Sequence, residues 1–405
     1  MGTATTVRGE HRSLFLLLAL IAALGPMTMQ IMMPALPAIQ QEFGASVAQA
    51  QLTFSVFVFT IGPALLIYGP LSDRYGRRPV LAVAIGVFCI GTLMCLLAPS
   101  LGWLVAGRAI QALGSAAGLV ITRALLSDLF GRDGMATALS WMSMAMVIPP
   151  MVAPSVGGLL VDQMSWRGIF LVLLVAGGAV LWCTLRYLPE PPPTAAQREG
   201  SWIEKYRTVL GRRSFYAYAV QGVLIIGIFY GFMAGAPYLM VNVMGRPATE
   251  YGLFFLLPAG GYLLGSYLSA RLSGRLGINR MVLLGAVLAF MFTLPLVVVT
   301  GVGWWVPLAF FLPMTLITVA NGIAVPSAQS GAISAVPEAS GTASSMIGFL
   351  QQAFAAVIIQ VVGLLQNDTP WPMVIVVVAS ALLSALGALL LQRRPTSPPV
   401  TSETR

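Results

Sequence analysis

Charged side chains gather in one short loop between two long apolar segments. The run Gly69-Pro70-Leu71-Ser72-Asp73-Arg74-Tyr75-Gly76-Arg77-Arg78-Pro79 holds one acid and three arginines, although only 9% of all residues are charged. Such a cluster is too costly to place in hydrocarbon, so it marks the water-facing ends of two membrane helices. An acid beside several arginines can also form charge-assisted hydrogen bonds, which are stronger than neutral ones.

A second set of polar side chains falls inside the apolar segments. Arg108 lies about seven residues, or about 10 Å, into its segment, and Gln111 follows one turn later. An arginine at that depth needs partners or water. Its side chain is either a strut, which donates hydrogen bonds to carbonyl groups of the first apolar segment, or a cavity-facing group that responds to cargo or protons. We favour the cavity-facing role.

Amide, methionine and aromatic side chains extend this set. Buried amides need hydrogen-bond partners, which a wet cavity provides, although bonding between helices is the alternative. Methionine and aromatic residues adapt to varied apolar ligands, but packing in the core is their usual role. The predicted substrate-binding residues are Gln30, Met33, Arg108, Gln111, Tyr230, Asn242 and Gln352.

Signatures of enzymes and of metal sites are missing from the chain. We find no phosphate-binding loop, no paired catalytic carboxylates and no histidine cluster. The three cysteines, Cys89, Cys95 and Cys183, lie in apolar runs and read as unpaired packing residues. We therefore expect no enzyme, no cofactor and no metal, and an ion or substrate gradient as the energy source.

The apolar segments themselves indicate an all-α membrane protein. The chain is 58% hydrophobic, with a mean hydropathy of +0.87, and its runs are continuously apolar rather than alternating. Twelve runs are about 20 residues or longer, the length that crosses a bilayer. They cover about 14–37, 50–69, 79–98, 101–127, 134–160, 166–188, 214–240, 250–272, 279–301, 304–330, 338–364 and 370–391.

A polar linker divides these runs into two sets of six. We expect an N-terminal six-helix bundle at 1–188, a cytoplasmic linker at 189–213, a C-terminal six-helix bundle at 214–392 and a tail at 393–405. The motif Leu71-Ser72-Asp73-Arg74 and its weaker copy Leu268-Ser269-Ala270-Arg271 follow the second span of each half, which favours two pseudo-symmetric halves.

The basic residues predict the orientation. With the N-terminus in the cytoplasm, almost all arginines and lysines of the loops face inward, which is the usual bias of membrane proteins. Both termini are then cytoplasmic. The same distribution places the net charge of +9 beside the membrane, so we expect no nucleic-acid partner.

Several motifs resemble the major facilitator superfamily. The loop at 69–79 is similar to its signature Gly-x-Leu-x-Asp-Arg-x-Gly-Arg-Arg, and 153–158 to the Pro…Gly-Gly element of its proton-linked drug exporters. The stretch 108–114 resembles their Arg-x-x-Gln-Gly element, with Ala112 in place of the first glycine. Pairs typical of the Bcr/CflA-type drug-resistance branch are Leu36-Pro37, Arg123-Ala124, Trp166-Arg167 and Ile169-Phe170, together with Asp128-Leu129-Phe130 and Gly341-Thr342-Ala343-Ser344.

One position departs from that branch. Its first span usually carries an aspartate four residues before a proline, and Gln30 stands there in this chain. Glutamine releases no proton, and none of the acids of the sequence falls in the middle of a predicted span. The group that usually couples transport to protons is therefore missing.

The resemblance gives the charged loop a role as a cytoplasmic gate. Either the loop only anchors the inner side, or it is a latch that stabilises the outward-facing state, and we favour the latch. Asp73 would face the start of the span near Glu338, and Arg77 would bridge Asp73 to Asp128. The predicted gate residues are Gly69, Asp73, Arg74, Arg77, Arg78, Arg123 and Asp128.

Prolines and glycines interrupt the fifth predicted span. Proline removes a backbone donor and bends a helix, and glycine lets a neighbouring helix approach closely. The region is either a static kink or a tight seam that prevents leakage between the halves, and we favour the seam. Its residues are Pro149, Pro150, Pro154, Gly157 and Gly158.

These expectations combine into one functional hypothesis. The resemblance implies a monomeric exporter of small amphiphilic drugs in a bacterial inner membrane, which works by alternating access and proton antiport. Because Arg108 lacks a fixed countercharge, neutral or weakly anionic cargo is favoured. The alternatives are an uncoupled facilitator or importer of a small neutral or anionic metabolite, and a membrane receptor that transports nothing.

Overall fold

The computed structural model describes the backbone of residues 3–190 and 202–392, and the side chains of 14–126, 148–190 and 204–391. This part of the chain is helical and holds no strand. The elements are α1 (Thr3–Ile31), η1 (Met33–Ala35), α2 (Leu36–Glu42), α3 (Val47–Tyr75), α4 (Arg77–Leu96), α5 (Leu101–Gln163), α6 (Trp166–Tyr187), α7 (Trp202–Gly211), α8 (Arg213–Tyr238), η3 (Leu239–Val243), α9 (Ala248–Leu276), α10 (Ile278–Val302), α11 (Pro307–Ser334), η4 (Pro337–Ala339), α12 (Ser340–Leu365) and α13 (Trp371–Gln392).

The predicted spans correspond closely to these helices. Among the described residues, eleven helices are long and apolar enough to cross a membrane. The first of them continues from α1 through η1 and α2 to Glu42. Pro34 and Pro37 lie at the first positions of η1 and α2, where a missing N–H is tolerated. The prolines therefore change the helix type without ending the span.

The long helix α5 supplies two spans. Its 63 residues would extend about 95 Å if they were straight. However, Gly118 lies against the carbonyl oxygen of Ile21 and Gly157 lies against that of Ile31, only ten residues further along α1. The first and second limbs of α5 therefore both contact α1, so α5 reverses its direction between Gly118 and Gly157. The predicted span at 134–160 falls mostly in residues whose side chains lie outside the described part, and it contains the second limb of α5.

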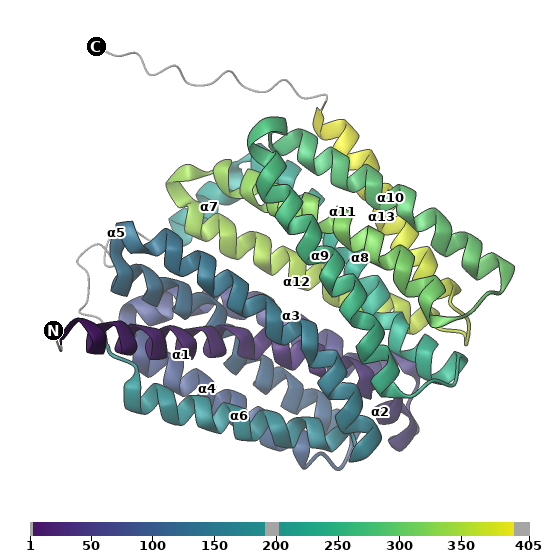
Figure 1. The fold of residues 1–405 in the computed structure, drawn as a ribbon, viewed down its shortest axis with the longest axis horizontal. Coiled ribbons are helices and arrows are strands. Elements are labelled where there is room, and N and C mark those ends of the chain that lie inside the picture. Colours follow the sequence, from purple (N-terminus) through teal and green to yellow (C-terminus); the bar gives the residue numbers. More distant parts are fainter. Residues whose placement is uncertain (1–2, 191–201, 393–405) are drawn as a thin grey trace.

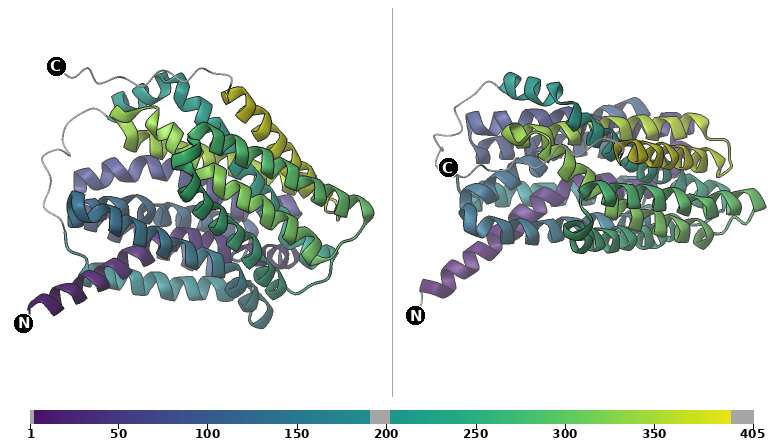
Figure 2. Two further views of the ribbon diagram at one scale, coloured as in Figure 1. Left: turned by 45° about the horizontal axis from the view of Figure 1, so that its top comes forward. Right: turned by 90° about the horizontal axis from the view of Figure 1, so that it is seen from above.

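The helices form two groups that meet along two lines of contact. Helices α1 and α3 to α6 pack on one another, and so do α8 to α13 (Figure 1). Between the groups, α3 packs on α12, and the second limb of α5 packs on α9. Helix α7 contacts η4, α8 and α12. The first turns of α1 extend beyond the neighbouring helices (Figure 2).

Successive long helices run in opposite directions, so their ends define two faces. The terminal face comprises residues 75–77, 188–190, 202–213, 276–278 and 335–340, and it lies on the side of the N-terminus and α7 (Figure 1). The distal face comprises residues 42–47, 96–101, 163–166, 243–248, 302–307 and 365–371. Any path across the molecule must connect these two faces.

Candidate functional site

A buried hydrogen-bond network surrounds Arg108, which is fully buried in α5. Its Nε donates to the carbonyl oxygen of Thr53 at 3.0 Å, and its Nη1 donates to Oε1 of Gln111 at 2.6 Å. Nε2 of Gln111 donates to the hydroxyl of Thr92 at 2.8 Å. The guanidinium also lies 4.0 Å above the ring of Phe57. Arg108 therefore forms a strut to α3, and not to the first span that we considered as the alternative to a cavity-facing role.

This arginine has no carboxylate partner among the described side chains. Their ion pairs are Arg77–Asp73, Arg167–Glu42, Arg212–Glu338 and Arg246–Glu250. Nη2 of Arg108 is sealed from solvent and has no hydrogen-bond partner. Both N–H groups on Nη2 of this buried cation are thus left for water or a ligand.

Other buried polar atoms share this lack of partners. They are Oε1 of Gln30, Oε1 of Gln51, the hydroxyls of Tyr238 and Tyr251, and both amide atoms of Asn321. Leaving a buried polar group unpaired costs about 1–3 kcal/mol, so such groups concentrate where another state or a ligand completes them. The contact of Gly25 with Ser115 sets Gln30 opposite about residue 110, at the depth of Arg108.

Tyr230 connects the two groups of helices near this depth. Its hydroxyl lies 3.3 Å from Oε1 of Gln352 and 3.5 Å from the sulfur of Met29. Its ring lies 6.3 Å from that of Phe54. The fully buried Met33 belongs to the same hydrophobic cluster as Tyr230. Residues of both groups therefore line one region of mixed polarity.

Asn242 lies apart from the other predicted substrate-binding residues. It is exposed in η3 at the distal face, where its amide donates to Oε1 of Gln40 at 3.2 Å. Asn242 falls just beyond the predicted span 214–240, and the structure places it at the distal end of the span that runs to Val243.

Uncharged hydrogen bonds join α3 to the second group. Nε2 of Gln51 donates to the carbonyl oxygen of Ala234 at 2.8 Å. Nε2 of Gln360 donates to that of Ala48 at 3.0 Å, and Oε1 of Gln360 accepts from Ser55 at 3.2 Å. The contact near the distal face is therefore made by amides and carbonyl groups.

The glycines of the fifth span lie at a close contact between three helices. A Cβ atom added at Gly157 would lie less than 3.0 Å from the carbonyl oxygen of Ile31, and one at Gly158 equally close to that of Ala248. The hydroxyl of Ser155 donates to the carbonyl oxygen of Gly252 at 2.8 Å. Pro154 is buried at this contact, whereas Pro149 and Pro150 are half-buried.

An acid that the sequence analysis left without a role continues this contact. The carboxylate of Asp162 accepts hydrogen bonds from the backbone of Ala248 at 3.2 Å and of Thr249 at 2.7 Å. It also accepts from the hydroxyl of Thr249 at 2.5 Å. A carboxylate at the first turn of a helix satisfies its free N–H groups and complements its dipole. Asp162 thus fastens the start of α9 to the end of α5.

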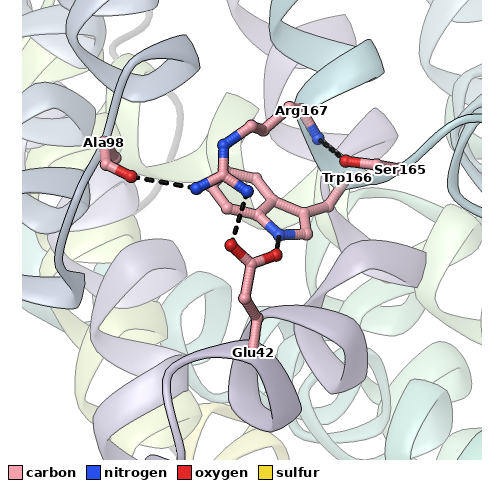
Figure 3. Close-up of polar contacts among 5 residues, drawn as sticks. All are labelled: Glu42, Ala98, Ser165, Trp166 and Arg167. Carbon is pink, nitrogen blue, oxygen red and sulfur yellow. Dashed lines mark hydrogen bonds and ion pairs between the residues drawn. The ribbon is translucent and has the colours of Figure 1, made fainter.

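A second charged cluster on the distal face stays within the first group (Figure 3). Glu42 accepts from the indole of Trp166 at 2.5 Å and pairs with Arg167. Arg167 also donates to the carbonyl oxygen of Ala98 at 3.0 Å, and its guanidinium lies 4.1 Å from the Trp166 ring. The cluster connects α2, α6 and the segment after α4.

The predicted gate residues lie at the terminal face. Asp73 is exposed and pairs with Arg77 at 2.5 Å, and Arg77 also donates to Ser72 at 2.7 Å. Arg74 is exposed, and its guanidinium lies 5.2 Å from the Tyr75 ring.

The other predicted gate residues do not complete the latch in this state. Glu338 pairs with Arg212 at 2.6 Å, and no described contact links Asp73 to the start of α12. Gly69 is half-buried and Arg123 is exposed. The side chain of Asp128 lies outside the described residues, so the proposed bridge from Arg77 stays a prediction.

Glu190 is a further partner of the loop that the sequence did not suggest. Its two carboxylate oxygens accept from the backbone N–H groups of Arg77 and Arg78 at 2.8 and 2.7 Å. The side chain of Arg78 donates to the carbonyl oxygen of Leu185. The start of the linker is therefore bound to the first turn of α4, which favours an anion.

Comparisons with known proteins agree with this architecture. Residues 18–359 match the Major Facilitator Superfamily. Multidrug resistance protein D of Escherichia coli is 29% identical over 359 residues, which cover 87% of this chain and 88% of that protein. A bicyclomycin resistance protein homolog of Haemophilus influenzae is 24% identical over 387 residues, covering 94% and 96%.

Solved structures show the same fold. A bacterial homolog of the human lysosomal transporter Spinster, in an inward-facing and occupied conformation, superposes with a TM-score of 0.73 at 16% identity. The match covers 96% of this chain and 99% of that chain. The chain is thus a transporter rather than an enzyme, and it belongs to the major facilitator superfamily.

Proposed function

We propose that this chain exports small amphiphilic compounds across a bacterial inner membrane by alternating access between its two groups of helices. The observation that carries the proposal is the set of buried, unpaired polar atoms in spans of both groups, including Gln30, Arg108 and Asn321. A transport path must offer such atoms to successive cargo molecules and to water. The resistance proteins that resemble the chain support the same cargo class.

The contacts support an inward-facing state. The terminal face carries the arginine-rich loop, and the positive-inside rule supports a cytoplasmic location for this face. The groups are joined toward the distal face by Asp162, Gln360 and the glycine contacts of α5. Rocking the two groups would separate these contacts and bring the terminal-face loops together.

The cargo should be neutral or weakly anionic. Arg108 is buried without a carboxylate partner among the described side chains, so a cationic cargo would be repelled. The free Nη2 donor and the free Oε1 acceptor of Gln30 suit a ligand that both accepts and donates hydrogen bonds.

Proton antiport is one of two coupling schemes that we consider. In antiport, protons would pass through the acids of the terminal face, Asp73 or Asp128, or be carried by the cargo. The second scheme is an uncoupled facilitator or importer of a small neutral or anionic metabolite. Gln30 favours this alternative, because it stands where the branch usually has an acid.

Transport in inside-out vesicles tests the proposal. Vesicles from cells that express the chain should accumulate compounds from a drug panel, and Arg108→Gln should abolish this while Arg275→Gln, an exposed arginine at the terminal face, should not. If the initial transport rates do not change with the pH gradient while the membrane voltage is clamped, proton antiport is excluded and the uncoupled scheme remains. Binding without movement of any compound would indicate a receptor instead.

A further inference from the structure

A groove opens between α8 and α13 at the terminal face, away from the contacts between the two groups. It encloses about 540 Å³ and is lined by Arg213, Tyr216, Ala217, Val220, Gln221, Gly387, Leu390 and Leu391. Both helices cross the membrane, and their spans begin at Arg213 and end at Leu391. The groove therefore lies where lipid headgroups meet the hydrocarbon.

The two helices pack on each other from the distal face to the inner end of this groove. Near the distal face they touch, because a Cβ atom at Gly235 would lie less than 3.0 Å from Met373. At mid-length a Cβ atom at Gly227 would lie 3.3 Å from the hydroxyl of Ser380. Gln221 faces Gly387 at the inner end of the groove, and the walls beyond it are the exposed side chains of Val220 and Leu390.

The floor of the groove carries a polar group that needs a partner. Gln221 is 2% exposed, and its Oε1 accepts from Ser384 at 3.4 Å. Its Nε2 has no partner among the described residues, yet it is not among the sealed atoms, so it opens into the groove. Gly387 makes room for this amide, because a Cβ atom there would lie less than 3.0 Å from Nε2.

A positive charge lies at the mouth of the same groove. Arg213 is exposed and forms no ion pair with a described side chain, unlike its neighbour Arg212, which pairs with Glu338. No acid lines the groove. Arginine at this depth extends toward the phosphates of the lipid surface, and basic pockets between membrane helices bind anionic headgroups.

We propose that this groove binds one anionic phospholipid. The headgroup phosphate pairs with Arg213, an ester carbonyl of the glycerol accepts from Nε2 of Gln221, and an acyl chain covers Val220 and Leu390. A free phosphate ion would satisfy Arg213 but would leave the apolar walls uncovered. The site is independent of the transport path and of the cargo.

Native mass spectrometry of the purified full chain in detergent tests this proposal. The probes are phosphatidylglycerol, phosphatidylcholine and inorganic phosphate. Wild-type protein should retain one phosphatidylglycerol in preference to phosphatidylcholine. Arg213→Gln should weaken this binding by about fivefold, the effect expected for one interfacial arginine. Leu390→Trp, which fills the groove from its exposed wall, should weaken binding of both lipids.

Arg275→Gln is the matched control, since Arg275 is an exposed arginine of the same face that does not line the groove. It should retain the lipid like the wild type. Equal binding of the two lipids by the wild type, which needs no variant, would overturn the proposal. So would unchanged phosphatidylglycerol binding by a folded Arg213→Gln protein, or full displacement of the lipid by inorganic phosphate.

Discussion

The two faces of the molecule use polar groups in opposite ways. On the distal face, Asp162 and the amides of Gln51 and Gln360 join one group of helices to the other. On the terminal face, the Asp73–Arg77 pair and the Glu190 contacts stay within the first group and the linker. The asymmetry indicates that the distal contacts determine the present state, whereas the terminal charges are available for another state.

Helix α7 makes one hydrogen bond to the first group of helices near the terminal face. The hydroxyl of Tyr206 in α7 donates to the carbonyl oxygen of Leu66 in α3 at 3.1 Å. Burial raises the pKa of Tyr206 above its usual value, so this hydroxyl stays protonated and remains a donor. The linker helix therefore contacts the first group through a neutral hydrogen bond and the second group by packing on η4, α8 and α12.

Widening the glycine contact of α5 should have the largest effect. Gly158→Leu would force its side chain into the backbone of Ala248 and separate α5 from α9. Overpacking of this kind costs about 1–3 kcal/mol, and here it would weaken the contact between the two groups of helices near the distal face. We expect loss of transport and a lower Tm, measured in vesicles and by thermal unfolding.

Gly178→Leu is the control for this change. Gly178 lies in α6, and a Cβ atom there would have no neighbour within 4 Å. This variant should keep its transport rate and its Tm. Equal behaviour of the two leucine variants would show that the close contact at Gly158 does not hold the face shut.

Removing the carboxylate of Asp162 should have the next largest effect. Asp162→Ala leaves the first N–H groups of α9 without their acceptor, which costs about 1 kcal/mol. We expect faster hydrogen exchange at Ala248 and Thr249, together with greater access of labelling reagents to a cysteine at position 242. Asp368→Asn, in an exposed turn, should change neither measurement.

These two predictions also show what the sequence could and could not supply. Continuous apolar runs determine where a chain crosses the membrane, so eleven predicted spans agree with the helices to within about six residues, whereas the fifth, 134–160, lies inside α5. The glycines at 157 and 158 were identified from their residue type and from the Pro…Gly-Gly element that 153–158 resembles. Asp162 was not, because its role depends on the start of α9, 86 residues later in the chain.

The network around Arg108 shows the same limit. The sequence placed Arg108 and Gln111 on one face of a helix, and the structure joins them. Thr53 and Thr92 come from α3 and α4, and their depth relative to Arg108 depends on the packing of these helices. No local pattern marks such threonines, so the alternative that we weighed, a strut to the first span, named a different helix from α3.

Weakening the uncharged contact of Gln360 should have a moderate effect. Gln360→Leu removes hydrogen bonds to Ala48 and Ser55, each worth about 1 kcal/mol. We expect the population to shift toward the state that is open on the distal face, measured as a longer spin-label distance between exposed positions 41 and 242. Gln366→Leu, beyond the end of α12, should leave this distance distribution unchanged. A shift of equal size in both variants would mean that the hydrogen bonds of Gln360 do not select the state.

Neutralising Asp73 should have the smallest effect on stability. Its side chain is 38% exposed, and exposed ion pairs contribute about 0–1 kcal/mol, so Asp73→Asn should hardly change the Tm. If the loop is a latch, Asp73→Asn should still slow transport. The contacts that the latch would form in the outward-facing state need the negative charge of Asp73. Asp73→Glu retains that charge and should recover part of the rate. A normal transport rate in Asp73→Asn would reduce the loop to an anchor, and the contrast between the faces would then rest on the distal contacts alone.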